Sequence, residues 1–263
     1  MKKKFWTVIL TSIFAIGLAV SIYQIADQLR EYREGDDSYT DLESYIGIPE
    51  NHADPTVSED IPTESGETVP EESQAQWPAV DFVALAEINP DIVGWLYIED
   101  TEISYPVVQG SDNQYYLKHL FSGEYNSSGC IFLDSRVSAD FSDRHSILYG
   151  HHMKNGTMFS GLDKYKTQEY YDAHPMGLLM TPGGNYEVEF FAGYVASVED
   201  AAWDVGFGSD AEFEAWLESA RERSWFESDV SVAVTDRILT LSTCSYEFDN
   251  ARFVLLGVLQ KAE

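Results

Sequence analysis

The sequence predicts a mainly β fold, a barrel or a sandwich, with one long helix inserted late in the chain. Nine short runs of apolar, β-branched and aromatic residues follow one another after residue 92, and turn signals such as Pro-Gly-Gly-Asn at 182–185 separate most of them. So many strands at short spacing favour a barrel or sandwich over a parallel sheet of βαβ units. The expected strands are 93–98, 103–108, 129–133, 146–149, 177–181, 186–198, 231–234, 238–243 and 253–259.

Two helices are expected within this β domain. The first covers 79–88 and ends at Asn89, because a following proline disfavours helical backbone. The second covers 211–223, where Asp210 or Ser209 can cap a segment whose apolar residues fall on one face. A cluster of aromatic residues is expected to pack this helix onto the strands, with part of it a candidate lining of a substrate groove: Trp203, Phe207, Phe213, Trp216, Trp225 and Phe226.

The N-terminus has the length and composition of a membrane anchor. Residues 5–25 contain no charged side chain, and these 21 residues at about 1.5 Å each span about 30 Å, the thickness of a bilayer core. Three preceding lysines predict a cytoplasmic tail at 1–4, a single-pass anchor at 5–25 and an extracellular remainder at the cell membrane. A cleaved signal peptide is the alternative, but the apolar stretch is long for one and no clear cleavage site follows it.

An acidic extracellular linker is expected at 26–76, ahead of a folded domain at 77–263. Between 34 and 76 there are 13 Asp or Glu, four Pro and no Lys or Arg. Such a stretch repels itself and lacks the apolar residues needed to offset the entropy of ordering. A short helix around 41–46 is the one element expected there.

Composition excludes several classes of function. The net charge of −29 argues against a nucleic-acid partner, which needs a basic surface. Two cysteines cannot form a disulfide-dense scaffold or a four-cysteine zinc site. The sequence contains no His-Glu-x-x-His, P-loop, Gly-x-Ser-x-Gly or EF-hand motif, so no cofactor is expected and no metal-binding residue is assigned. The surplus of acidic side chains leaves a dependence on calcium open.

The run 237–259 holds the strongest chemical signal. Strand alternation places Cys244 at the end of a strand, on its more polar face with Thr240 and Ser242. If the chain forms a hairpin centred near Phe248, Arg252 lies opposite Cys244, whereas a slip of one residue would reverse it. A guanidinium beside a thiol favours the thiolate or donates to a developing oxyanion. Cys244 is therefore the candidate nucleophile.

A histidine is the usual proton partner of a cysteine nucleophile, and the run 146–152 presents two at the end of a strand. His151 and His152 are adjacent, so they should point to opposite sides and only one can serve. Adjacent histidines seldom bind one metal ion together, which argues against a zinc site with Cys244. The remaining histidines lie in the linker or in contexts that look solvated: His52, His119, His145 and His174.

These segments resemble the sortases. Thr-Leu-Ser-Thr-Cys at 240–244 with Arg252 eight residues later, together with 149–159, resembles the family, while 88–117 and the late helix resemble its class B branch. The similarity covers about 88–259. It implies a closed sortase-type β-barrel with N-terminal helices on the outer face of a Gram-positive membrane. Such enzymes cleave a C-terminal sorting motif of a secreted protein after threonine and join the product to an amino group of a peptidoglycan precursor or of a pilin.

The resemblance also implies residue roles. Cys244 would attack the threonine carbonyl, His151 would move protons at the departing and incoming amines, and Arg252 would hold substrate or stabilise the oxyanion. Some members carry acidic residues just after the cysteine, where this chain has Ser245 and Tyr246, so no fourth catalytic residue is assigned. Three further residues match class B substrate grooves: Asn113, Leu117 and Ser242.

Two other functions compete with this interpretation. One is a membrane-tethered cysteine protease that releases the acyl group to water, and the other is a surface display protein whose cysteine is inert. Cys130 lies in a strand-like run and is expected to be a buried free thiol, because pairing it with Cys244 would silence the nucleophile. Asp134 and Arg136 are expected to form a solvated turn.

Overall fold

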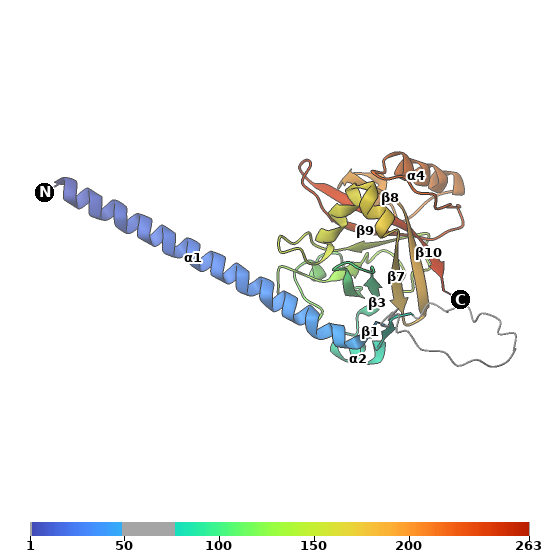
Figure 1. Cartoon of the computed structure of the whole chain (residues 1–263), viewed down its shortest axis with the longest axis horizontal. Helices are drawn as coiled ribbons and strands as arrows, with labels where there is room; N and C mark the ends of the chain where they lie inside the picture. The colour runs from blue at the N-terminus through green and yellow to red at the C-terminus, as the bar shows by residue number, and fades with distance from the viewer. Residues whose placement is uncertain (1, 49–76, 263) are drawn as a thin grey trace, which may run out of the picture.

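A closed eight-stranded barrel with one long helix leading into it makes up the protein (Figure 1). The structure is a computed structural model that describes residues 2–48 and 77–262. The barrel confirms the expected closed β fold. Its strands are β3 (Ile92–Tyr97), β4 (Ser104–Val108), β5 (Ile131–Leu133), β6 (His145–Tyr149), β7 (Met176–Thr181), β8 (Gly184–Ser197), β9 (Ile238–Cys244) and β10 (Ala251–Lys261).

The strand order around the barrel is β10-β8-β7-β3-β4-β5-β6-β9. Most neighbours are antiparallel, but β4 pairs with β5 and β6 pairs with β9 in parallel. Parallel neighbours need a long crossover connection, and the crossover from β6 to β9 contains β7, β8 and the late helix α4 (Asp210–Glu222). The ends of β6 and β9 therefore meet at the same edge of the barrel.

Apolar side chains cover both faces of the C-terminal strands. One buried cluster fills the barrel, and a second lies between α4 and the outer faces of β8 and β10. The side chain of Ser209 accepts a hydrogen bond from the backbone of Glu212 at 3.2 Å and so caps α4, while Phe213 and Trp216 pack beneath the helix. The expected late helix is confirmed, with Ser209 as its cap.

Residues 231–234 do not form the strand expected there. Val232 and Val234 are half-buried against the cluster beneath α4. Their alternating spacing therefore reflects this packing contact and not pairing with a neighbouring strand.

The expected helix at 79–88 is shorter than predicted. Its first residues form β2 (Ala79–Val80), which pairs with β1 (Ile46–Gly47), and α2 (Phe82–Ile88) follows.

The N-terminal helix α1 (Lys2–Leu42) is continuous from the apolar stretch to the barrel. The linker expected at 26–76 is therefore wrong for residues 26–48, which form the end of α1, the turn η1 (Glu43–Tyr45) and β1. Tyr39, Leu42 and Ile46 are buried in the barrel's main cluster, and this spacing is that of an amphipathic helix running into a strand. The rest of the predicted linker, 49–76, lies outside the described residues.

Hydrogen bonds fix the end of α1 to two loops of the barrel. The backbone carbonyl of Glu31 accepts from Asn126 at 2.9 Å, and the carboxylate of Asp36 accepts from Asn155 at 3.1 Å. The hydroxyl of Tyr39 donates to the Gly129 carbonyl at 2.5 Å. Asn155 belongs to the loop that follows His151, so α1 contacts a segment next to the candidate site.

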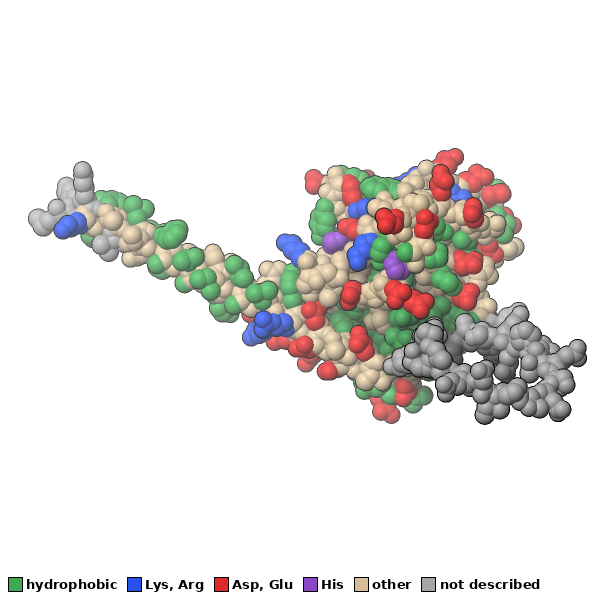
Figure 2. Space-filling view, viewed as in Figure 1, with side chains coloured by type: hydrophobic (Ala, Val, Ile, Leu, Met, Phe, Trp, Pro, Cys, Tyr) green, Lys and Arg blue, Asp and Glu red, His purple; other side chains and the backbone are tan. Residues whose placement is uncertain are grey.

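The first half of α1 projects away from the barrel and exposes its apolar side chains (Figure 2). Phe5, Phe14 and Ile25 are 65%, 75% and 59% exposed. By length and composition this helix can cross a membrane, and its most apolar window has no burial inside the protein. An exposed apolar surface of this size marks a contact with lipid or with another protein.

Two truncations test the docking of α1. Deleting residues 1–28 removes a helical segment in which no described side chain is buried, and it should give a soluble protein with an unchanged thermal midpoint relative to the full chain. Deleting 1–48 also removes the buried Tyr39, Leu42 and Ile46, which should cost on the order of 5 kcal/mol of unfolding free energy. Thermal unfolding by circular dichroism measures both, and equal midpoints for the two truncations would contradict the docking.

Candidate active site

Cys244 and Arg252 face each other across the last hairpin of the barrel. β9 and β10 pair in antiparallel register with Arg252 directly opposite Cys244, which confirms the predicted register. Directly opposite residues project from the same face. The residues of β9 that precede Cys244 are buried, whereas Cys244 and Arg252 are partly exposed. A thiol and a guanidinium are therefore presented together at the rim.

His151 reaches the same rim from the other side of β9. The last registered pair between the parallel strands β6 and β9 is Tyr149 with Ser242, and the backbone of Gly150 donates to the Ser242 carbonyl at 3.1 Å. His151 and Cys244 each lie two residues beyond that pair. The structure thus brings the three candidate residues to one barrel edge, on neighbouring chain segments.

A backbone carbonyl orients the ring of His151. Its Nε2 lies 2.7 Å from the carbonyl oxygen of Leu117. A carbonyl only accepts hydrogen bonds, so Nε2 carries the hydrogen and Nδ1 is the acceptor in the neutral ring. The observed contact of Leu117 at the site is thus made by its backbone, and its side chain packs against the main cluster.

His152 points elsewhere, as expected for adjacent residues. Its Nε2 lies 2.8 Å from a carboxylate oxygen of Asp163, and its ring packs edge-on against Tyr246 at 5.3 Å. Asp163 belongs to the helical turn η3 (Phe159–Lys166). His152 thus contacts a carboxylate on η3, whereas the β6–β9 register places His151 beside Cys244.

A cavity of ≈ 210 Å³ opens beside Arg252. Of the three predicted groove residues, Ser242 lines this cavity. Asn113 is half-exposed and accepts a hydrogen bond from the backbone of Ser135 at 2.8 Å. Larger cavities of ≈ 600 and ≈ 480 Å³ are lined by none of the predicted catalytic and groove residues, although Trp225 and Phe226 of the aromatic cluster line the first. The cavity beside Arg252 is lined by Tyr149, Val198, Trp203, Ser242 and Arg252.

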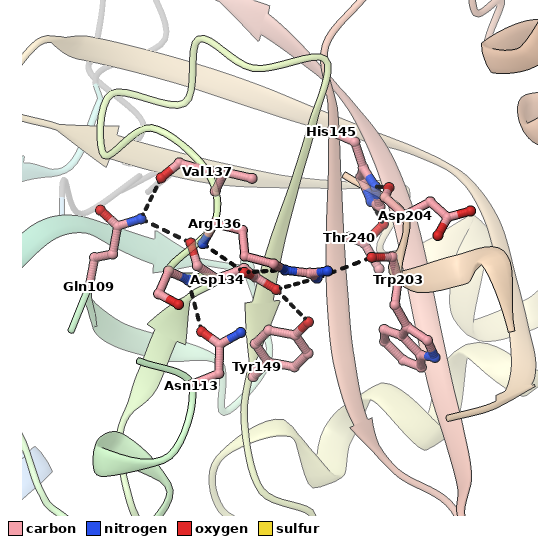
Figure 3. A network of polar contacts seen from close by, with 11 residues as sticks. Gln109, Asn113, Asp134, Arg136, Val137, His145, Tyr149, Trp203, Asp204 and Thr240 are labelled. Carbon is pink, nitrogen blue, oxygen red and sulfur yellow. Dashed lines mark hydrogen bonds and ion pairs between the residues drawn. The ribbon is translucent and has the colours of Figure 1, made fainter. Parts of the chain in front are cut away.

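An ion pair between the buried Asp134 and the half-exposed Arg136 contacts Tyr149, which lines this cavity (Figure 3). The side chain of Asp134 is fully buried and accepts from Arg136 at 2.7 and 2.9 Å and from the hydroxyl of Tyr149 at 2.8 Å. Burial alone would raise the pKa of Asp134, but the hydrogen bonds from Arg136, Asn113 and Tyr149 outweigh it and lower the pKa to about 2. The solvated turn expected for Asp134 is therefore wrong.

The same network holds the loop between β8 and α4. Arg136 donates to the carbonyl of Trp203 at 3.1 Å. Nδ1 of His145 lies 2.6 Å from the carbonyl of Asp204, and Nε2 lies 2.7 Å from the hydroxyl of Thr240 (Figure 3). His145 is fully buried, which overturns its expected solvation, and this burial lowers its pKa to about 4.

Sequence reasoning missed Tyr149 as a cavity residue, but it named Trp203 in the aromatic cluster of which part was a candidate groove lining. Tyr149 is part of the segment that carried the resemblance, so its place just before Gly150 was an available signal. Trp203 belongs to the aromatic cluster expected to pack the late helix. That cluster divides: Phe213 and Trp216 pack α4 onto the strands, whereas Trp203 lines the cavity.

Cys130 is a buried free thiol, as predicted. Burial raises its pKa to about 12, so it stays protonated and unreactive at neutral pH. Cys244, in contrast, is partly exposed. Within residues 2–48 and 77–262 no group of three or more His, Cys, Asp or Glu side chains is arranged to hold a metal ion.

The fold and the site together define a cysteine acyl-transfer enzyme on a closed β-barrel. Residues 96–260 match the family model described as the sortase domain. The chain is 41% identical over 177 residues to sortase B of Listeria monocytogenes, covering 66% of this chain and 72% of that protein. The chain therefore belongs to the sortase family, in its class B branch, whose members are cysteine transpeptidases.

Solved structures agree with this assignment. A Staphylococcus aureus sortase B–substrate complex is 35% identical, with a TM-score of 0.66 over 69% of this chain and 85% of that one. Sortase B from B. anthracis in complex with AAEK1 is 31% identical, with a TM-score of 0.71 over 89% of this chain and all of that one. The similarity to the B. anthracis structure thus covers more of this chain than the similarity to the Staphylococcus aureus structure does.

The buried His145 gives the fold a defined acid sensitivity. Its pKa of about 4 lies below the ordinary value of 6.5, so between these two values the unfolded chain binds a proton that the folded chain does not. Stability should fall as pH drops from 6.5 to 4, by about 3 kcal/mol in total. Denaturant unfolding of the full chain in detergent at several pH values measures this slope. The unfolding free energy of His145→Gln should depend less on pH between 6.5 and 4. An equal slope in the variant and the wild type would contradict the lowered pKa assigned to His145.

Proposed function

We propose that the chain is a membrane-anchored transpeptidase in which Cys244, His151 and Arg252 are the catalytic residues. The arrangement of β6, β9 and β10 carries this proposal, because it presents one thiol between an imidazole and a guanidinium at the barrel rim. The substrate is a secreted protein with a C-terminal sorting motif, which is cut after threonine. The acceptor is an amino group of a peptidoglycan precursor or of a pilin.

The reaction has two acyl-transfer steps. The Cys244 sulfur, after giving its proton to Nδ1 of His151, attacks the threonine carbonyl, and Arg252 donates hydrogen bonds to the resulting oxyanion. The C–N bond then breaks, His151 protonates the departing amine, and a thioester remains. In the second step the acceptor amine loses a proton to His151 and attacks the thioester, and the Cys244 sulfur leaves as the thiol.

The cavity beside Arg252 is the proposed start of the substrate groove. Ser242 and Tyr149 line it, and Asn113 and Leu117 are assigned to the same groove because they match class B segments. The solved substrate complex of Staphylococcus aureus sortase B supports a groove on this barrel. The chemistry described above uses only side chains of this chain.

The proposed location is the cell membrane, with the N-terminus in the cytoplasm and the barrel outside. The exposed apolar half of α1 and the lysines at 2–4 support a single-pass anchor of this orientation. The net charge of −29 disfavours nucleic acid as a partner. In this proposal residues 1–4 are the tail, 5–25 the anchor, and the barrel with the docked end of α1 the catalytic domain.

Substitutions separate the proposed catalytic residues from their neighbours. Cys244→Ala and His151→Ala should lower kcat at least about 10³-fold, and Arg252→Ala about 10²-fold, because each removes a group acting on the reacting atoms. Cleavage of a threonine-containing sorting peptide measures the effect. Cys130→Ala is the control and should stay within twofold. If His152→Ala is inactive and His151→Ala is active, the base is misassigned.

Product analysis separates transpeptidation from proteolysis. With a sorting peptide and a simple amine such as triglycine, mass spectrometry should find the amide of the amine in preference to the free acid. The reason is that the thioester persists long enough for an amine to compete with water. Hydrolysis alone, unchanged across a series of amines, would instead establish a membrane-tethered cysteine protease.

A further inference from the structure

Lys166, at the end of η3, contacts the turn that follows Cys244. Its ammonium lies 2.6 Å from a carboxylate oxygen of Glu247 and 3.1 Å from the hydroxyl of Ser245. Ser245 also hydrogen-bonds Glu247. One cation thus holds the first and third residues after Cys244, and its own side chain is only 18% exposed.

The same ammonium is tied to the segment that carries His151. It lies 2.8 Å from one carboxylate oxygen of Asp163, whose other oxygen lies 2.8 Å from Nε2 of His152. His152 is bonded covalently to His151. A continuous chain of contacts therefore runs from the residue after Cys244, through Lys166 and Asp163, to the residue after His151.

A positive charge is required at this point. Asp163 and Glu247 approach the same ammonium, and without it two carboxylates would face each other across the gap between η3 and the hairpin. Burial raises the pKa of Glu247, but the hydrogen bonds from Lys166 and Ser245 outweigh it and lower the pKa to about 2. Burial lowers the pKa of Lys166, and its two carboxylate partners raise it by more. The bridge is therefore charged at neutral pH.

Aromatic rings enclose the ammonium on its remaining sides. It lies 5.7 Å from the ring centre of Trp225 and 5.5 Å from that of Phe253, both within cation–π range. Phe253 follows Arg252 on β10. Lys166 thus contacts the neighbours of Cys244 and Arg252 directly, and it reaches the neighbour of His151 through Asp163. Its ammonium is occupied by three oxygen atoms.

We propose that Lys166 is a positioning residue that holds the Cys244 turn against the His151 segment. This inference rests on the proposed function of Cys244 and His151. The bridge keeps sulfur and imidazole in the geometry of proton transfer, and a misplacement of about 1 Å between reacting groups can reduce the rate by about 10²-fold. Lys166 itself touches neither the substrate nor the reacting atoms in this mechanism.

The test uses the full chain in detergent with Lys166→Met, Lys166→Arg and Lys164→Met. Lys164 is an exposed lysine of the same turn and serves as the matched control. Lys166→Met should lower kcat about 10- to 100-fold with KM within twofold, at a temperature where its circular dichroism shows it folded. Lys166→Arg should recover most of the loss, and Lys164→Met should stay within twofold.

The effect of Glu247→Gln on activity should have opposite signs in the wild-type chain and in Lys166→Met. Glu247→Gln should lower the activity of the otherwise unchanged chain, because it removes one partner of the ammonium. In the Lys166→Met background the same change should raise activity, since it removes an unpaired carboxylate facing Asp163. Additive losses would overturn the proposal.

Alkylation of Cys244 by iodoacetamide separates this proposal from the proposed function, since it needs no turnover. Cys130 is buried, so the reaction reports on Cys244. In Lys166→Met the pH dependence of alkylation should move from the wild-type curve toward that of His151→Ala. If the pH dependence of alkylation in Lys166→Met equals that of the wild type, or if kcat of the folded Lys166→Met variant is unchanged, the positioning role is overturned. If the wild-type chain transfers no peptide but the curve still shifts, the proposed function fails alone.

Discussion

The parallel pairing of β6 with β9 is the constraint on which the site depends. These strands are about 90 residues apart in sequence, yet their register places His151 and Cys244 at equal distances beyond the last pair. The antiparallel hairpin then adds Arg252 from the other side. A slip of one residue in either pairing would turn a side chain to the opposite face. One face of β9 contributes Leu239 and Leu241 to the main cluster, and the other carries Thr240 and Ser242. Both registers are specified because a slipped strand would turn these hydroxyl groups into that cluster.

Ionic and polar bridges then hold the loops that the barrel alone would leave free. The Asp134–Arg136 pair reaches the Trp203 carbonyl on one side of the cavity, and Lys166 reaches Ser245 and Glu247 on the other. Buried charges are tolerated only when they are paired and fully hydrogen-bonded. Asp134 meets that condition with donors from Arg136 and Tyr149. The site thus combines a rigid strand edge with loops fixed by charge.

Local patterns predicted much of this arrangement. The short hairpin made the pairing of Cys244 with Arg252 predictable, and apolar spacing located α4 and the eight strands of the barrel. It also predicted a strand at 231–234 that does not form, and it missed β1 and β2. Contacts between distant segments were not predictable: the burial of His145 and Asp134 depends on the β8–α4 loop folding back over β6. The docked end of α1 was missed because the prediction of a linker rested on its many acidic residues. The apolar spacing of Tyr39 and Leu42 was too short a signal to change that prediction. Lys166 gave no local signal beyond the nearby Asp163, since Ser245 and Glu247 come from another part of the chain.

The continuity of α1 changes how the enzyme would reach its substrates. Only five residues separate the end of the apolar stretch at Ile25 from the first barrel contact at Glu31, and the six steps along the helix rise about 9 Å. With α1 in a bilayer, this helix would hold the barrel close to the lipid headgroups. Because β1 and β2 pair with each other, the length of the chain between them does not change the distance from the barrel to the membrane. Sorting signals and acceptor amines would then have to come to the membrane surface to meet the thiol.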